Sequence, residues 1–305
     1  MFPVVDDLRA MEFGTPGKSR ETIVNFVVHG KKRATAGLAA EYEKQSEDIE
    51  YIGECLAMVD NDSRHIATLQ VTRVEESRFA DVPDEFALAE AEGDLNAADF
   101  RASHYDFWTR IGETITDDTK IIQIYFNLLT HRLRKLEETD VDWLTRACQD
   151  EDVQRWTKIP RPYERHHGES FVKDHAGELA VWVIVDSRTQ EPVGVCSIHN
   201  ITNGVASVGY WVCSIHNITN GVASVGYWVS PWGRKSGAAS TALRIMPTLA
   251  RRIGNAHTLQ ATIAETNAAS QRTAARAGFT LIGNSPDSCP DGTEVAQGLL
   301  YELRI

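Results

Sequence analysis

Apolar and polar positions in residues 1–129 follow patterns that predict a mixture of helices and strands. In "SRETIVNFVVHG" the apolar residues Ile23, Phe26 and Val27 recur at helical spacing, and Gly30 stands where a glycine ends a helix. The runs "GECLAMVD" and "RHIATLQVTRV", joined by the turn "NDS", predict a β-hairpin. A short helix that begins at its proline is expected in "DVPDEFALAEAEGD", and "TKIIQIYFNLL" predicts the closing strand.

The elements expected in residues 130–305 follow a different order. "TDVDWLTRACQD" predicts a capped helix and "LAVWVIVD" a buried strand, and hairpin strands come next. A helix over about residues 237–252 contains Pro247, which removes a backbone donor and should bend it. The strand "TLQATIA", a helix over residues 267–277 and final strands complete this half. The patterns therefore predict an α+β chain of two domains, 1–129 and 130–305.

Residues 196–212 recur without one change as residues 213–229. Each copy, "CSIHNITNGVASVGYWV", has the pattern of strand, Asn-Gly turn and strand, which predicts a hairpin. Only the second copy continues into "SPWG", so its outgoing strand, Val222 to Val229, is expected to serve the site that follows. About seventeen residues, mainly 205–219, are expected to be displaced from the core sheet as a hairpin or bulged loop. A recent duplication and a cloning or assembly artefact both explain an identical repeat.

The net charge divides the chain at the same place. Residues 1–129 carry 25 acidic and 13 basic side chains, whereas residues 130–305 carry 18 of each, so the whole formal excess of −12 lies in the first domain. A surface this acidic repels a phosphate backbone and disfavours broad, nonspecific nucleic-acid binding. With no apolar run near the roughly 20 residues of a membrane span, no signal-peptide pattern, and five cysteines without disulfide or metal spacing, we expect a cytoplasmic protein with neither membrane nor metal partner.

The residues after the second copy have the features of an anion site. "SPWGRKSGAASTALRIM" predicts a strand, a tight glycine-containing loop and a helix that begins near Gly237. The free amides and the dipole of such a helix start favour a diphosphate. The small residues Gly237, Ala238 and Ala239 let the backbone approach the anion closely.

This stretch resembles a known family. "RKSGAA", residues 234–239, is similar to the R/Q-x-x-G-x-G/A motif of the GNAT acetyltransferases, and "NAASQRTAARAGF" resembles the branch that acetylates ribosomal-protein N-termini and small amines. The resemblance covers about residues 130–305 and implies an α/β GNAT fold with a mixed central sheet. It also implies an N-acetyltransferase that uses acetyl-CoA as co-substrate, with an amine of a protein N-terminus or a small molecule as acceptor. The residues then expected to contact the coenzyme are Val229, Trp232, Gly233, Arg234, Lys235, Ser236, Gly237, Ala238, Ala239, Asn267 and Ser270.

The residues for proton transfer are less clear from the sequence. Many GNAT enzymes have a tyrosine four residues before the glycine of "GF", and here that place holds Ala274, so another group or water must protonate the leaving thiolate. Glu265 is close in sequence to the cofactor strand and is the candidate general base. "RPYERHHGES" offers Tyr163, His166 and His167 for an amine pocket, with a solvated loop as the alternative, and no further ligand at metal spacing.

The first domain resembles the ASCH domain, a PUA-like β-barrel, through "FGTPGKSRETIVNFVVHGKKRATAGL", "FADVPDEFALAEAEGD" and "HYDFW". Small bacterial members of that family hydrolyse acetylcytidine with a lysine, threonine and glutamate set, which falls here on Lys32, Thr35 and Glu92. A partly desolvated lysine has a lowered pKa and can activate a hydroxyl as nucleophile. The resemblance thus implies two alternatives to acetyl transfer, an amidohydrolase acting on an acetylated nucleoside and a non-enzymic binder of nucleoside or RNA. His104, with the aromatic residues of "HYDFW", would then either stack on a base or pack at the edge of the barrel.

Overall fold

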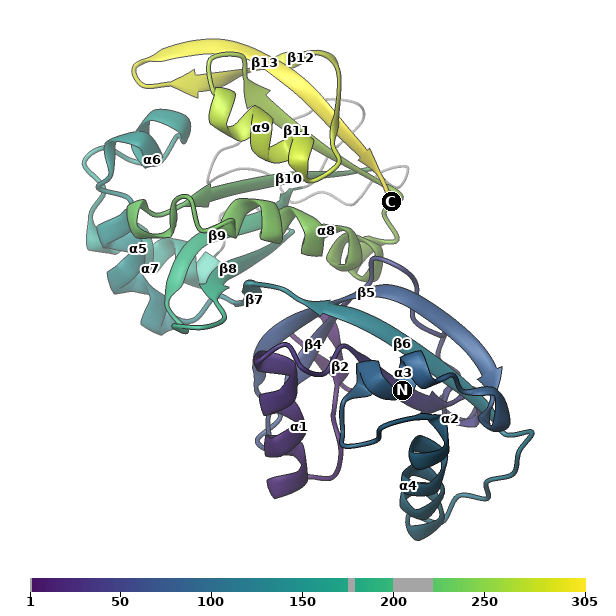
Figure 1. Cartoon of the computed structure of the whole chain (residues 1–305). Helices are drawn as coiled ribbons and strands as arrows, with labels where there is room; N and C mark the ends of the chain where they lie inside the picture. Colours follow the sequence, from purple (N-terminus) through teal and green to yellow (C-terminus); the bar gives the residue numbers. More distant parts are fainter. Residues whose placement is uncertain (1, 175–178, 200–221) are drawn as a thin grey trace. The chain divides into compact units, whose positions relative to one another are not determined.

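The computed structural model describes residues 2–174, 179–199 and 222–305, and it divides into two compact units, Met1–Leu129 and Thr130–Ile305 (Figure 1). Each unit combines its own β-sheet with its own helices, so the predicted α+β class is confirmed. The segment expected to leave the core sheet, residues 205–219, lies outside the described residues. Among the helices within the described ranges, none has the length and apolarity needed to cross a membrane.

The N-terminal unit contains a six-stranded sheet in the order β1-β2-β4-β5-β6-β3. Its main elements are β1 (Val4–Val5), β2 (Leu8–Met11), α1 (Lys18–Val28), β3 (Ala34–Leu38), α2 (Ala39–Gln45), β4 (Cys55–Val59), β5 (His65–Arg78), α3 (Asp84–Glu90), α4 (Ala97–Arg110) and β6 (Lys120–Leu128). The predicted hairpin is the antiparallel pair of β4 and β5. The expected short helix is α3, which ends earlier than Gly93 because Ala91 adopts a left-handed conformation with φ 54°.

Strand β6 supplies both hydrophobic cores of this unit. Side chains alternate between the two faces of a strand. On one face, Ile122 and Phe126 join a cluster with Ile23 and other residues of α1 and β4. On the other face, Ile121 and Tyr125 join a cluster that contains aromatic residues of α3 and α4. The nearly unbroken apolar run of β6 follows from this burial on both faces.

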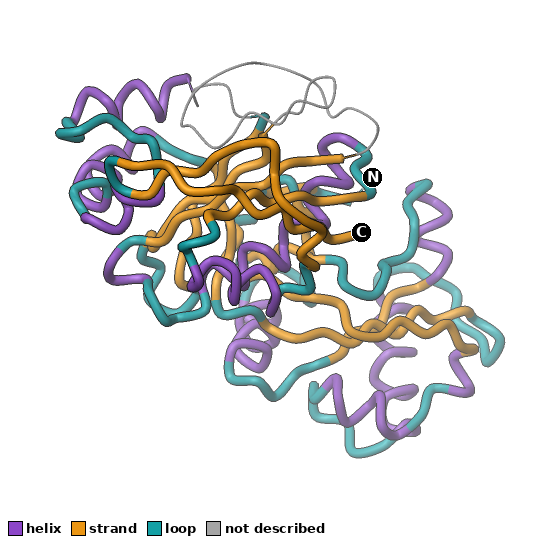
Figure 2. Tube along the Cα trace, turned by 90° about the horizontal axis from the view of Figure 1, so that it is seen from above, coloured by secondary structure: helices purple, strands orange, loops and turns teal. Residues whose placement is uncertain are grey.

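The described residues of the C-terminal unit form a seven-stranded sheet in the order β12-β13-β11-β10-β9-β8-β7, and among these strands only the pair β10 and β11 is parallel. Its main elements are β7 (His131–Lys135), α5 (Val141–Ala147), α6 (Glu151–Trp156), α7 (Arg165–Asp174), β8 (Ala180–Asp186), β9 (Pro192–His199), β10 (Val222–Val229), α8 (Ala238–Gly254), β11 (Thr258–Ala264), α9 (Ala268–Arg276), β12 (Thr280–Asp291) and β13 (Glu294–Arg304). Helices flank the strands of this sheet (Figure 2). The sheet is mixed, as predicted for a GNAT fold.

Helices α5, α7 and α8 all pack against the strands of this sheet. Val181 and Val183 pack with Trp143 of α5 and Phe171 of α7 in one cluster, while α8 contacts β7, β8, β9 and β10. Helix α8 is one continuous helix with Pro247 inside it. The four cysteines among the described residues are free and buried.

The neighbouring strands β9 and β10 contain residues of different copies of the repeat. Strand β9 ends with the first four residues of the first copy, and β10 consists of the last eight residues of the second. They pair antiparallel from His199↔Ser224 to Gly194↔Val229. If seventeen residues are removed, the same register is closed by a three-residue loop, Thr-Asn-Gly, whose glycine stands where such loops need a positive φ. The pairing is therefore the one that a chain with a single copy would form.

We expect the one-copy chain to be at least as stable as the full chain. Removing either copy leaves the same polypeptide, and the residues between His199 and Val222 fall from 22 to five. Because the entropy cost of closing a loop grows with its length, the free energy of unfolding should be unchanged or higher by about 1 kcal/mol. Guanidinium denaturation of both chains measures this difference, and a clearly less stable one-copy chain would show that the extra residues support the fold.

Candidate functional site

Strands β10 and β11 lie side by side at one end only. Their Cα partners are Val222↔Thr258, Ala223↔Leu259 and Ser224↔Gln260, and the pairing ends there. Each strand nevertheless continues on its other side, β10 with β9 and β11 with β13. The separation of the two strands can be followed in Figure 1. Among the described residues, the backbone groups that face the gap therefore have no partner in the sheet, and they are available to a ligand.

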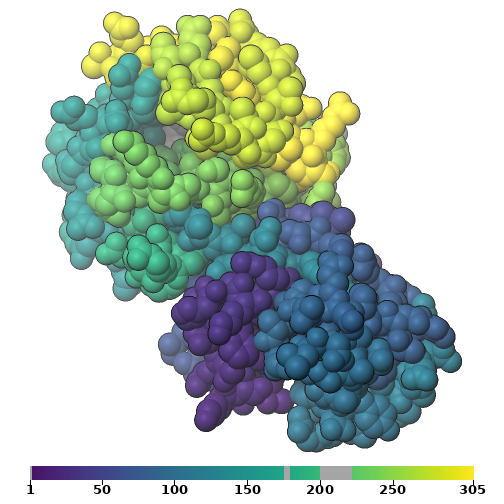
Figure 3. Space-filling model, viewed as in Figure 1, coloured from purple at the N-terminus to yellow at the C-terminus, as the bar shows by residue number. Residues whose placement is uncertain are grey.

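A cavity of about 640 Å³ occupies this gap. Its walls come from both separated strands, the loop before α8, and the starts of α8 and α9. Residues of α6, Trp156 among them, close a further side. Figure 3 shows the surface hollowed between the teal atoms of α6 and the yellow-green atoms of α9. The volume is within the usual range of pockets that bind cofactors and small molecules.

The loop from β10 to α8, residues 230–237, requires glycine at two places. A Cβ added to Gly233 would lie 2.6 Å from Val193 Cβ and 2.7 Å from Val193 O, so only glycine fits there. Gly237 caps α8 with φ 89°, a left-handed conformation that other residues adopt at a cost. Ser236 Oγ donates to Gly233 O at 2.7 Å and accepts from Ala238 N at 3.3 Å, which fixes the loop internally.

The start of α8 is suited to an anion. The helix has 17 residues, and no acidic side chain occupies its described first turn, so its first amides and its dipole favour negative charge. Arg234 forms ion pairs with Asp150 and, at 3.3 Å, with Asp152 of α6. Its charge is therefore already balanced, and it ties the loop to α6. Lys235 is exposed, lines the cavity, and forms no ion pair with any described residue, so its ammonium group is available.

His131 supports this loop from beneath. The side chain is 1% exposed, and its Nε2 lies 3.1 Å from Ser236 Oγ while its Nδ1 lies 2.9 Å from Thr130 Oγ1. Burial lowers the pKa of His131 against the opposing charge of Asp186. The imidazole beneath the loop is thus favoured in its neutral form.

The far wall of the cavity carries two hydroxyl groups in contact. Asn267 caps α9 and accepts from Ser270 N at 3.0 Å, which orients the first turn of the helix. Ser270 Oγ lies 2.7 Å from the Tyr227 hydroxyl of β10. Burial raises the pKa of Tyr227 to about 12, although the hydrogen bond with Ser270 opposes this. Ala274, one turn further along α9, is fully buried. Tyr227 is the tyrosine of this wall among the described residues, and its sequence position on a strand far from α9 gave no signal of the contact.

The other residues considered for catalysis or acceptor binding lie elsewhere. Glu265 is exposed and is not among the described residues that line the cavity, so its role as a base stays a prediction. Tyr163 is 2% exposed and packs with Cys148 and its neighbours, and the histidines of α7 do not line the cavity within the described residues. His199 does line it, with Nε2 3.2 Å from Ser197 Oγ, and it was missed because it belongs to the repeated segment.

In the N-terminal unit, the chain turn after α1 buries Lys32. Gly30 has φ 71°, and its N–H donates to Val27 O at 2.9 Å, which ends the helix and turns the chain inward. Lys32 is fully buried, and its Nζ lies 2.6 Å from Glu92 Oε1 and 3.4 Å from Glu90 Oε1. The structure thus brings Lys32 and Glu92 together. Thr35 is half-buried on β3, and its hydroxyl makes no hydrogen bond with any described residue.

Glu90 and His104 complete this group, and neither was predicted as a reactive residue. Glu90 is 2% exposed and its Oε1 accepts from Ala36 N at 3.1 Å. Burial raises the pKa of Glu90, while Lys32 and His104 oppose this effect. His104 of α4 stacks on Phe100 with ring centroids 3.8 Å apart, and Trp108 is buried in the core. Of the two roles expected from the sequence, stacking on a base or packing within the domain, the burial of Trp108 favours packing.

Both units match known family models. Residues 9–130 match the model described as ASCH domain, and residues 131–280 match the model described as Acetyltransferase (GNAT) domain. No curated protein matches the chain. Among solved structures, an ASCH domain from Lactobacillus crispatus is 23% identical over 39% of this chain and 77% of its own, with a TM-score of 0.36. A RimL ribosomal L7/L12 α-N-protein acetyltransferase in complex with coenzyme A is 21% identical over 58% of this chain and 94% of its own, with a TM-score of 0.46. RimJ from Mycobacterium smegmatis is 20% identical over 57% of this chain and 81% of its own, with a TM-score of 0.46.

The chain therefore consists of an ASCH domain followed by a GNAT acetyltransferase domain. The second domain makes it an acyltransferase of the N-acetyltransferase type, with acetyl-CoA as its co-substrate.

We expect Gly237→Ala to weaken acetyl-CoA binding far more than it destabilises the fold. A Cβ on Gly237 meets no atom within 4 Å, so the strain of the positive φ costs only about 1 kcal/mol, but it adds bulk where the diphosphate would contact the helix start. Gly292→Ala is the matched control, because Gly292 also has a positive φ, 71°, and open space. Calorimetric titration should show at least a tenfold loss for Gly237→Ala alone. Equal affinities in the two variants would contradict an anion site at this loop.

Proposed function

We propose that acetyl-CoA binds in the gap between β10 and β11 and that an amine acceptor attacks its thioester there. The observation that carries this proposal is the end of pairing at Ser224↔Gln260, beside a cavity that reaches the start of α8. Unpaired strand groups favour an extended pantetheine arm, which would hydrogen-bond like an added strand. The amides of residues 232–239 and the Lys235 ammonium would hold the diphosphate. Contacts with Val229, Asn267 and Ser270 would fit the same path of the coenzyme.

The chemistry proposed in this gap is direct transfer. A deprotonated amine attacks the carbonyl carbon of the thioester, backbone N–H groups stabilise the developing oxyanion, and the C–S bond breaks to release the thiolate. Tyr227 and Ser270 would stabilise that thiolate by hydrogen bonding. With a pKa of about 12, the Tyr227 hydroxyl is a weaker acid than a thiol of pKa about 8.5, so it would not transfer its proton completely. The proton that the amine releases would finally neutralise the sulfur.

His199 is the proposed general base. Its ring lines the cavity together with Ser197 and Gly226, on the strand pair that forms one wall, and imidazole is the side chain most often used for proton transfer at neutral pH. Glu265 remains the alternative from the sequence. The proposed acceptor is the amine of a protein N-terminus or of a small molecule, and the aromatic side chains of Trp156 and Trp228 would border its approach.

A second function is favoured by the contact between Lys32 and Glu92 in the ASCH domain. Burial of the Lys32 ammonium group costs free energy of desolvation, which its ion pair with Glu92 at 2.6 Å offsets in part. The contact between Lys32 and Glu92 supports amide hydrolysis of an acetylated nucleoside. In this reaction Lys32 would activate the Thr35 hydroxyl and Glu92 would carry the proton. Binding of a nucleoside or RNA without chemistry is the alternative role for this domain.

The role of His199 is tested by acetyl transfer from acetyl-CoA to a panel of small amines and N-terminal peptides, followed as free thiol. We expect His199→Gln to lower kcat about 100-fold at neutral pH, with recovery at higher pH as the amine loses its proton unaided. Glu265→Gln is the control and should stay within twofold of the unchanged chain. The reverse ranking would assign the base to Glu265, and no binding of acetyl-CoA in calorimetry would refute the acetyl-CoA site itself.

The second function is tested with acetylcytidine as substrate. Glu92→Gln should lower its hydrolysis at least 100-fold without unfolding the domain, because the Glu92 side chain is 30% exposed. Glu85→Gln, at an exposed position of α3, is the control and should have no effect. Absence of hydrolysis by the unchanged chain would exclude this activity, and binding of cytidine or a short RNA without turnover would favour the non-enzymic role.

A further inference from the structure

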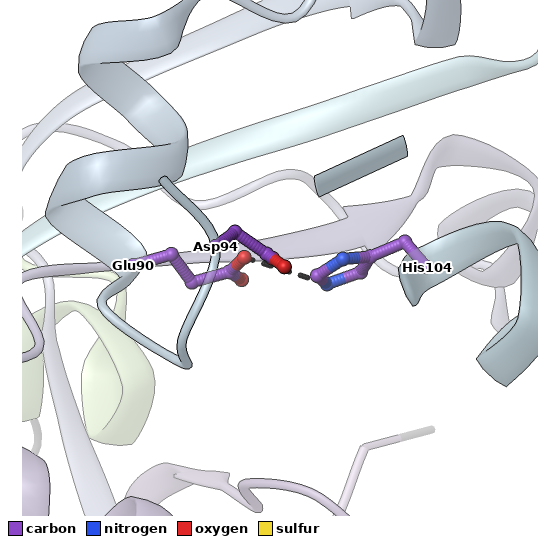
Figure 4. A group of neighbouring side chains, drawn as sticks. All are labelled: Glu90, Asp94 and His104. Carbon is purple, nitrogen blue, oxygen red and sulfur yellow. Dashed lines mark ion pairs between the residues drawn. The ribbon is translucent and has the colours of Figure 1, made fainter. Parts of the chain in front are cut away.

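A group of three potential metal ligands lies beside Lys32 in the ASCH domain. Glu90, Asp94 and His104 each offer one oxygen or nitrogen atom, and these atoms lie within 4.8 Å of one another. Figure 4 shows the two carboxylates and the imidazole ring converging from different parts of the chain. Glu90 is the last residue of α3, Asp94 lies in the following loop, and His104 projects from α4. We call these three residues the Glu90 cluster.

One oxygen of Glu90 has no donor. Its Oε1 faces Lys32 Nζ and Ala36 N, but its Oε2 accepts no hydrogen bond from any described residue although it is buried. The nearest charged partner of Oε2 is His104 Nε2, at 3.4 Å. A buried carboxylate oxygen without a donor is expensive, and such an oxygen normally binds a proton or a cation.

The orientation of His104 favours the cation. Its Nδ1 lies 3.1 Å from Phe100 O, and a carbonyl only accepts, so Nδ1 carries the hydrogen. In a neutral ring the lone pair is then on Nε2, which faces Glu90 Oε2. Two lone pairs that face each other repel unless a positive charge lies between them. Histidines that bind metals commonly donate their second nitrogen to a backbone carbonyl in this way.

The charges agree with a doubly charged ion. Lys32 contributes one positive charge, and Glu90, Glu92 and Asp94 contribute three negative charges, which leaves two negative charges if His104 is neutral. A divalent cation would balance them. Lys32 contacts the opposite oxygen of Glu90, so its ammonium group does not occupy the position between Glu90 Oε2 and His104 Nε2.

We propose that Glu90 Oε2, an oxygen of Asp94 and His104 Nε2 bind a divalent transition-metal cation, with Zn²⁺ as the best match. One imidazole and two carboxylates form a ligand set that suits zinc, and three protein ligands leave a position open to water or substrate. The spacing of the three residues, four and then ten positions, follows no familiar metal motif, which is why the sequence predicted no metal. Lys32 and Glu92 lie beside the site, because Lys32 contacts both Glu90 and Glu92.

The proposal is tested by calorimetric titration of the full chain with Zn²⁺, and separately with Mn²⁺, after treatment with a chelator. We expect one Zn²⁺ per chain at micromolar or lower Kd, and at least a tenfold loss of affinity in both Asp94→Asn and His104→Gln. His29→Gln, at an exposed histidine of the same domain, and His166→Gln, beside Glu164 on the other domain, are controls that should keep the affinity. Substitution with Co²⁺ gives a visible absorption band as a second readout.

Two results would overturn the metal site. One is the absence of saturable binding below about 1 mM, which would leave a proton on Glu90 as the explanation of its unpaired oxygen. The other is equal affinity in Asp94→Asn, His104→Gln and the unchanged chain, which would place any bound metal elsewhere. Thermal unfolding of each variant without metal shows that it folds, so a loss of binding is not confused with a loss of structure.

Discussion

The one-sided pairing of β10 is the constraint on which the C-terminal domain depends. Beyond Ser224, β9 is the one strand among the described residues that pairs with β10, and this ladder holds it in place beside the cavity. Close packing reinforces the ladder, since a Cβ on Gly194 would lie 2.5 Å from Trp228 O. An edge without a partner is usually covered or paired in proteins. The pairing with β9 therefore fixes where β10 ends, and with it the position of the loop at Gly233 and of the start of α8.

The sequence predicted best the elements in which local pattern and burial agree. The strand "TLQATIA" is β11, Thr258–Ala264, and the helix expected over residues 267–277 is α9, Ala268–Arg276. The glycine-rich loop and the helix that begins after Gly237 were likewise visible, because their residues stand together and each has a conformational reason to be there. At these positions the local conformational preference of the residues agrees with the tertiary packing, so the predicted elements form in the folded chain.

The reactive groups were harder to predict because distance in sequence hides them. Tyr227 meets Ser270 across 43 positions, so assigning its strand to the site from the sequence did not show which side chain of α9 it would contact. Glu90 lies on a short helix, where a carboxylate usually faces solvent, and only the fold shows that it is buried against Lys32. The acidic excess of the first domain was plain from composition, but which of its 25 acidic side chains lie inside was not.

His131 gives the loop before α8 a sensitivity to acid. Its pKa is lowered in the folded chain and ordinary, about 6.5, in the unfolded one, so as the medium is acidified below that value the unfolded chain takes up the proton first. Stability that is complete above pH 6.5 is then progressively lost as the pH falls toward the folded value. Because the same imidazole contacts Ser236, protonation of His131 would also disturb the loop before α8. A single buried imidazole thus makes the stability of this loop depend on pH.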